Sequence, residues 1–286
     1  MRGTLDASTM AYCRDKAVPP GSDLHYALMM AEHRQRGPLL AVWALWVELS
    51  DVPITVSDAT VAERKLQWWR EELQRAADGG GDHPVSQLLV ATDLLDQRRH
   101  ADTRELLDGI EEELLYHAYP DEAALLAHAH RSGAPLGRLL ARASAADSAA
   151  ADSLHHFGIA FRLQQLLLRA RASITCGRCH LPEDALRAAG IDRDALHAER
   201  TSAALAVVFD NAAQRIETLY AQADASLPAA HWRTLRSCRA LAALQRALLD
   251  ELRRSGFPLL EQRTELTPLR RLWIAWRAAR AQPRSS

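Results

Sequence analysis

The chain has 286 residues, enough for one large helical domain or two small ones. Its formal net charge of −1 offers no bulk attraction to a polyanion, so we expect no nucleic-acid partner. The opening residues lack the apolar segment of a secretory signal and the chain has four cysteines, so we expect a cytoplasmic protein with reduced thiols.

Apolar residues recur at three- and four-residue spacing along the chain, and no stretch alternates apolar and polar residues long enough to favour a strand. The sequence therefore predicts an all-α fold. No linker, repeat or low-complexity stretch divides it, so we expect a single domain over 1–286 with a core of about 10–280. In chain order we expect two short helices in 5–35, one from Pro38 to Leu49, one after Thr60, others near 85–97, 102–116, 121–143, 148–175, 200–224 and 228–254, a short one after Pro182 and a last one after Pro268.

The helix expected from Pro38 is the candidate centre of the fold. Proline suits the first position of a helix, and Leu39–Leu49 is apolar on every side except at Glu48. A helix of this kind belongs inside a bundle. Shortly before it, Ser22 or Asp23 can cap the second short helix by accepting from its free backbone N–H groups.

The next helix is expected to begin at a capping box. Thr60 and Glu63 have the required three-residue spacing, and an apolar stripe follows them. Trp68 and Trp69 lie within this helix. We expect both tryptophans to pack in the core rather than to contact a ligand.

One long helix running into a turn is expected over 158–182. Arg162, Gln165 and Arg169 fall three and seven residues apart, so they share one polar face. Gly177 then ends the helical region. The opposite, apolar stripe consists of Leu163, Leu166, Leu167 and Ala170.

Several stretches resemble the squalene/phytoene synthase family. The frame Gly158-x-Ala-Phe-x-Leu, followed by Gly177-Arg-x-x-Leu-Pro, is similar to the family's second substrate motif. Further similar stretches begin at Tyr12, Arg64 and His83, so the resemblance spans nearly the whole chain. It implies a single-domain, isoprenoid-synthase-like helical bundle and an isoprenoid or lipid ligand. In the full family it also implies prenyl diphosphates, held against magnesium by aspartates.

The positions that match the family's metal-binding aspartates depart from its pattern. Ser50, Asp51 and Ile54 stand where the first motif has three carboxylates, and Arg169 and Ser173 replace both aspartates of the second. A divalent ion about 5 Å from a guanidinium is repelled by about 6–7 kcal/mol at an effective dielectric near 20. We therefore expect no metal site and no cofactor, with magnesium needed only under the alternative hypothesis given below.

Arginines near these positions suggest an anion site instead, because guanidinium groups match phosphate oxygens. Arg171 belongs to this group of arginines. The alternative is that the arginines pair with acidic residues on neighbouring helices. The candidate substrate- or anion-binding residues are Ser22, Tyr26, Arg162, Gln165, Arg169 and Arg178.

Cys176-Gly-Arg-Cys179-His180 has the spelling of a haem-attachment motif. That attachment normally takes place outside the cytoplasm, and these residues also lie within the frame that resembles the synthase family. We therefore expect reduced, unreactive thiols here.

The closing segment, residues 269–286, carries five arginines and no acidic residue. Leu269, Leu272, Trp273 and Trp276 share one face of the expected helix. This pattern is typical of a helix that lies on an anionic membrane surface or docks on a protein partner. A terminal helix packed on the bundle, with a solvated basic side, is the alternative interpretation.

Two main hypotheses for function follow. The first is a non-catalytic isoprenoid- or lipid-binding protein or assembly factor, cytoplasmic and peripheral on the inner membrane, because both aspartate sets are lost. Residues 47–57 and 258–277 also resemble the family's degenerate branch, which includes a mitochondrial complex I assembly factor. The second is an active prenyl transferase in which Glu48, Asp51 and the arginines replace the metal clamp. A third hypothesis is a structural protein with a collapsed cavity.

Overall fold

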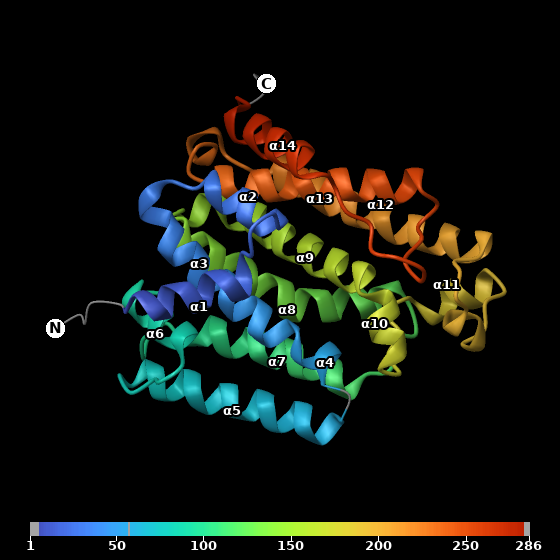
Figure 1. Ribbon diagram of the computed structural model, residues 1–286, viewed down its shortest axis with the longest axis horizontal. Coiled ribbons are helices and arrows are strands. Elements are labelled where there is room, and N and C mark those ends of the chain that lie inside the picture. The colour runs from blue at the N-terminus through green and yellow to red at the C-terminus, as the bar shows by residue number, and fades with distance from the viewer. Residues whose placement is uncertain (1–5, 57, 283–286) are drawn as a thin grey trace.

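The computed structural model describes residues 6–56 and 58–282, and within them the elements longer than an isolated bridge are all helices (Figure 1). This confirms the predicted all-α, single-domain bundle. The helices are α1 (Ala7–Ala17), α2 (Asp23–Met29), α3 (His33–Ser50), α4 (Val52–Thr55), α5 (Ala59–Ala77), α6 (Pro84–Ala91), α7 (Ala101–Leu115), α8 (Glu122–Ala143), α9 (Ala151–Leu168), α10 (Ala170–Thr175), α11 (Glu183–Ala188), α12 (Ala203–Ala225), α13 (Arg236–Arg254) and α14 (Pro268–Arg280).

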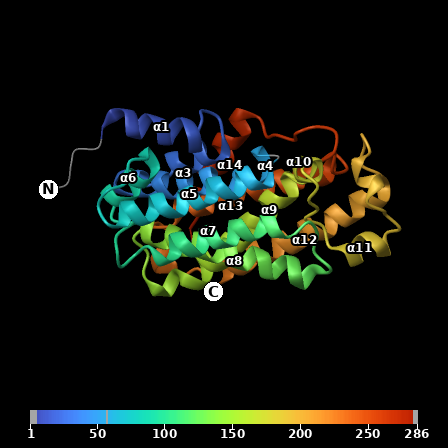
Figure 2. The ribbon, with the colours of Figure 1, turned by 90° about the horizontal axis from the view of Figure 1, so that it is seen from below.

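Helix α9 runs through the middle of the molecule. It packs against α8 on one side and α12 on the other, with α13 also touching it (Figure 1). Beyond α8, the bundle continues through α7 to α5, which forms the lower edge in Figure 1 and lies towards the viewer in Figure 2. At the opposite edge α14 lies on α13 and α2.

Helix α3 is a core helix, as its apolar sequence predicted. Residues 33–55 are the one segment of the described chain that is long and apolar enough to span a membrane, but 72% of its apolar window is buried inside the bundle. Trp43 and Trp46 are both buried, and their rings lie 5.2 and 5.9 Å from the ring of Phe161 on α9. These aromatic contacts tie α3 to α9.

Glycines set the distance between α8 and α9. A Cβ atom placed on Gly158 would lie 2.1 Å from the carbonyl oxygen of Gly133, and one on Gly137 would lie 2.3 Å from that of Leu154. The two backbones therefore approach as closely as they do only because these positions carry no side chain. This close contact holds α9 at the centre of the bundle.

Several predicted helix boundaries are wrong, for local reasons. Helix α3 begins at His33 rather than Pro38, because Glu32 and Gln35 form a capping box further upstream. Helix α5 is capped by Asp58, which accepts from the N–H groups of Thr60 and Val61, so the predicted Thr60–Glu63 box does not form.

The helix expected over 148–175 is interrupted at Arg169, where φ is −97° and ψ is 11°, so that α10 continues separately. The end near Gly177, at φ +76°, agrees with the prediction. Trp69 is buried as expected. Trp68 is 42% exposed, so the prediction that it packs in the core is wrong.

Candidate functional site

A large cavity opens between α3, α9, α10, α13 and the segment 259–271, and we call it the central cavity. Its volume is about 850 Å³. Trp46 and Phe161 give it an apolar wall, while arginines from three parts of the chain reach its edge. Its principal lining residues are Ser22, Asp23, Trp46, Val47, Phe161, Gln165, Arg169, Arg171, Cys176, Gln245, Glu261, Arg263, Glu265 and Arg271.

Arg169 and Asp51 form an ion pair at this cavity, where α3 and α9 both end. The Arg169 Nη2 atom lies 2.7 Å from Asp51 Oδ1, and Nη1 donates to the Ser50 carbonyl at 2.8 Å. Lys16 Nζ lies 3.8 Å from the second Asp51 oxygen. Burial lowers the pKa of Arg169 and Asp51 opposes that shift. A guanidinium nevertheless stays protonated, so a cation occupies this position.

The carboxylates present do not fit a magnesium site. In the described residues no three His, Cys, Asp or Glu side chains gather closely enough to hold a metal ion. Asp51 is already bonded to Arg169, and Glu48 accepts from the Tyr12 hydroxyl at 2.6 Å with Lys16 Nζ 3.7 Å away. Magnesium needs several oxygen ligands that converge on it, and cations hold the oxygens here.

Glu48, named as a candidate catalytic residue, does not line the central cavity. It is buried and faces α1, where Tyr12 and Lys16 contact it. Burial, followed by the hydrogen bond to Glu48, raises the pKa of Tyr12. The Tyr12 hydroxyl therefore stays protonated and donates to the carboxylate. Glu48 serves to join α1 to α3.

Arg162 is paired inside the protein, as the alternative interpretation of the arginines expected. Its side chain is 1% exposed and bonds through Nη2 to Glu113, which is equally buried. Nε donates to Ser132 Oγ at 3.1 Å and Nη1 to Gln165 Oε1 at 2.8 Å. Burial alone raises the pKa of Glu113, but Arg162 and His180 outweigh it and leave that pKa lowered. Arg162 is therefore not free to bind an anion.

The other predicted residues divide between the cavity and the rest of the fold. Gln165 lines the cavity and donates to Ser50 Oγ at 2.9 Å, so it connects the Arg162 pair to the cavity wall. Ser22 also lines it, while its hydroxyl caps α2 by accepting from His25 N–H. Tyr26 packs beside α13 and α14, and Arg178 is buried and donates to the Pro53 carbonyl, so neither reaches the cavity.

Arginines that the sequence motifs did not single out complete the cavity. Arg271 lies 2.8 Å from Asp23, and Arg263 lies 3.1 Å from Glu265. Arg171, noted among the arginines of this region, donates to the carbonyls of Leu260 and Glu261 at 2.7 and 3.0 Å. The sequence around α9 could not identify Arg263 and Arg271 as cavity residues, because only the path of the α13–α14 connection brings them close to α9.

The C-x-x-C-H pattern has no haem geometry. His180 faces the buried ion pair, with Nε2 3.3 Å from Glu113, and the thiols of Cys176 and Cys179 are free. Cys176 contacts the Ile54 carbonyl at 3.5 Å. Cys176 lines the central cavity, whereas Cys179 and His180 are buried away from it.

Comparison with known proteins agrees with the fold. The model of the family described as squalene/phytoene synthase matches residues 19–270. The chain belongs to the squalene/phytoene synthase family.

Within this squalene/phytoene synthase family, two relatives illustrate the range of similarity. The chain is 31% identical over 167 residues to a phytoene synthase of Thermus thermophilus, a stretch covering 57% of each protein. It is 22% identical over 277 residues to a presqualene diphosphate synthase of Sinorhizobium fredii, covering 96% of this chain and 99% of that one. The match thus spans just over half of the first relative and almost all of the second.

Solved structures establish the fold independently. A dehydrosqualene synthase in complex with a ligand superposes with a TM-score of 0.80 at 15% identity, covering 95% of both chains. A squalene synthase from Alicyclobacillus acidocaldarius gives 0.69 at 19% identity, covering 87% of this chain and 95% of that one. The predicted isoprenoid-synthase-like bundle is confirmed.

The relatives correct the first functional hypothesis. The expectation of a non-catalytic lipid-binding or assembly factor is wrong, because the squalene/phytoene synthase relatives that match over most of the chain are synthases. These matches give no support to the assembly-factor branch of the family.

Proposed function

We propose that this protein is a prenyl transferase that joins prenyl diphosphates in the central cavity, with arginines beside the diphosphate in place of a magnesium–carboxylate clamp. The observation that carries the proposal is the match to a presqualene diphosphate synthase over 96% of this chain and 99% of the relative. The retained cavity, with its apolar wall and arginine edge, supports it.

The cavity separates apolar from charged surface in the way such a substrate requires. A prenyl chain would lie against Trp46 and Phe161, since burying apolar surface is favourable. Its diphosphate would meet Arg169 and Arg171. In the described residues no carboxylate pairs with Arg171, whose bonds go to two backbone carbonyls. Its positive charge is thus available to an anion.

Prenyl transfer breaks the bond between the first carbon of one prenyl group and its diphosphate. The diphosphate leaves with the bonding electrons, the double bond of the second prenyl group supplies the electrons for the new carbon–carbon bond, and a proton is lost. Guanidinium groups fixed beside the leaving oxygens stabilise the charge that develops on them. Asp51 and the Ser50 carbonyl hold Arg169 in place for this role.

Purified protein incubated with farnesyl or geranylgeranyl diphosphate, with magnesium or with EDTA, tests the proposal. We expect a coupled prenyl product and released diphosphate under both conditions. Arg169→Ala or Arg171→Ala should raise KM or lower kcat about 10–100-fold, because a hydrogen bond to a charged group contributes about 1.5–3 kcal/mol.

Arg187→Ala, an exposed arginine on α11 outside the cavity, is the matched control and should leave the rate unchanged. Folded protein that makes no product and releases no diphosphate in any condition would overturn the proposed function. Product that forms only with magnesium would retain the transferase and refute the arginine clamp.

We further propose that α14 places the protein on the cytoplasmic face of an anionic membrane. Leu269, Leu272, Trp273 and Trp276 are exposed, by 81, 39, 53 and 45% of their surface. Ala275, on the other side of the helix, is buried against the bundle. One face of α14 therefore packs on the bundle, and the exposed face supports the proposed membrane contact.

The charge of α14 favours a lipid surface over a neutral partner. Arg277 and Arg280 stack on Trp273 and Trp276, each with its Cζ atom 4.6 Å from the ring centre. In the described part of the chain neither arginine has a carboxylate within ion-pair distance, whereas Arg270 and Arg271 are paired. Tryptophan with arginine suits the headgroup region of a bilayer. Residues 283–286 of the predicted segment lie outside the described residues.

A further inference from the structure

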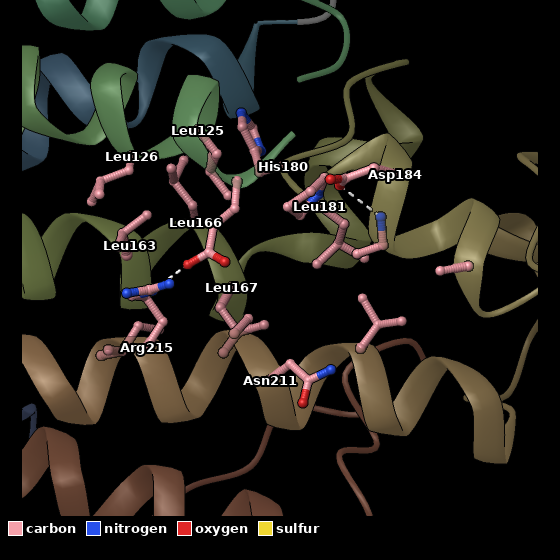
Figure 3. A pocket seen from close by; sticks show the side chains of 17 residues that line it. Leu125, Leu126, Leu163, Leu166, Leu167, His180, Leu181, Asp184, Asn211 and Arg215 are labelled. Atoms are coloured by element: carbon pink, nitrogen blue, oxygen red, sulfur yellow. Dashed lines mark hydrogen bonds and ion pairs between the residues drawn. The ribbon is translucent and has the colours of Figure 1, made fainter. Parts of the chain in front are cut away.

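A second cavity lies behind α9, and we call it the α9–α12 pocket. It has a volume of about 270 Å³ and is bounded by α8, α9, α12 and the segment 180–188 (Figure 3). Apolar side chains form most of its wall. Leu125 and Leu126 come from α8, Leu163, Leu166 and Leu167 from α9, and Ile216 from α12.

Helix α9 separates this pocket from the central cavity. Leu163, Leu166 and Leu167 turn towards the α9–α12 pocket, while Gln165 and Arg169 line the central cavity. The two spaces share no lining residue. A molecule in the α9–α12 pocket therefore occupies a site distinct from the proposed diphosphate site.

The rim of the pocket gives no attraction to an anion. Arg215 bonds to Glu122 across the rim, as Figure 3 shows. Asp184, an acidic residue at another part of the rim, accepts from the N–H group of Ala185 at 2.7 Å. In the described residues Arg215 is the one arginine or lysine that lines the pocket. A diphosphate headgroup would thus meet a paired cation and an acid.

We propose that the α9–α12 pocket binds a short, neutral hydrocarbon chain, of the kind found in a prenyl alcohol. An apolar cavity of this kind is poorly suited to water, which needs several polar partners, and its lining gains dispersion contacts when a hydrocarbon fills it. The exposed amide of Asn211 at the mouth can donate to or accept from one hydroxyl group. A volume of about 270 Å³ limits the occupant to a short chain.

A matched pair of ligands distinguishes this pocket from the central cavity. Geraniol carries a neutral hydroxyl, and geranyl diphosphate carries the same chain with an anionic head. We expect the full-length protein to bind geraniol in isothermal titration calorimetry and to retain that binding when geranyl diphosphate is present in excess. Arg169→Ala should leave geraniol affinity unchanged. This binding measurement does not depend on turnover, so its result is independent of the proposed function.

Ala212→Phe, which fills the pocket from α12, should weaken geraniol binding at least tenfold. Ala221→Phe, an exposed position further along the same helix, is the control and should bind as the wild type. Asn211→Trp at the exposed mouth provides a second blocking variant that places no bulk in the core. Thermal unfolding of each variant checks that it is folded.

Three results would overturn the inference. The first is that the wild type does not bind geraniol. The second is that both blocking variants fold and still bind geraniol with the affinity of the wild type. The third is that geranyl diphosphate displaces geraniol, or that Arg169→Ala no longer binds geraniol. The last result would place geraniol in the central cavity.

Discussion

Arg169 shows how one side chain changes the charge of a site while its geometry is kept. It stands at the end of α9 and reaches Asp51 and the Ser50 carbonyl at the end of α3. A carboxylate at the same position would repel Asp51 unless a cation lay between them. The guanidinium supplies that positive charge itself, so the two helix ends are joined without a metal ion.

The buried pair of Glu113 and Arg162 makes a sharp prediction about stability. Glu113→Ala should lower the free energy of unfolding by about 3–5 kcal/mol, because it leaves the Arg162 charge buried and unpaired. Urea denaturation measures the effect. Glu122→Ala, which removes the exposed partner of Arg215, should cost less than about 1 kcal/mol. If both variants lost the same free energy of unfolding, the buried ion pair would contribute no more to stability than the exposed one.

Individual residue roles were only partly predictable from sequence. The polar face of Arg162, Gln165 and Arg169 was correct as a pattern, and two of its members reach the central cavity. The third, Arg162, pairs with Glu113, which lies 49 residues away in sequence. The spacing of residues along α9 cannot reveal a partner so distant in the sequence. The same holds for Glu48. The helix that contains it was predicted, but its hydrogen-bond partner on α1, Tyr12, was not.

At the scale of helices, the contact between α8 and α9 depends on the absence of side chains. Gly158→Ala should lower the free energy of unfolding by about 1–3 kcal/mol, since its Cβ would press on the Gly133 carbonyl. Gly37→Ala in α3 is the control, because its Cβ would find room 3.7 Å from Thr92. That variant should gain about 0.5–1 kcal/mol from helix propensity. A neutral Gly158→Ala would contradict the close packing.

Helix α14 predicts membrane association that depends on its exposed tryptophans. The wild type should float with vesicles containing phosphatidylglycerol and should bind neutral vesicles less, with weaker binding at high salt. Trp273→Ala with Trp276→Ala should reduce flotation about tenfold or more. Trp68→Ala, which removes an exposed tryptophan from α5, should not. Equal binding by all three proteins would exclude α14 as the contact.

Helix type and order were readable from periodicity, whereas helix ends were not. Capping residues decide where a helix ends, and several residues close together in the sequence can each act as the cap. At the start of α5, for example, Asp58 is the cap although Thr60 was predicted. The predicted helix near 85–97 stops at Ala91, because Thr92 bonds back to the Leu88 carbonyl and Asp93 adopts a φ of +59°. Such interruptions arise from single backbone angles that apolar spacing does not report.

For the whole molecule, stability should fall as pH falls below about 6.5. Burial, followed by the Arg162 charge, lowers the pKa of His128 from 6.5 to about 3. The unfolded chain therefore takes up a proton at His128 below pH 6.5 while the folded protein does not, and acid favours unfolding. His128→Gln should flatten the dependence of the unfolding free energy on pH between 6.5 and 4.5. An unchanged slope would show that His128 is protonated in the folded state.

The connection between α13 and α14 borders both the central cavity and the helix that we propose contacts lipid. Arg271 belongs to α14, lines the cavity and bonds to Asp23. In the proposed membrane-bound state, residues 259–271 would place this side of the cavity beside the bilayer. An apolar product of the proposed reaction would then enter the lipid laterally, without being solvated by bulk water.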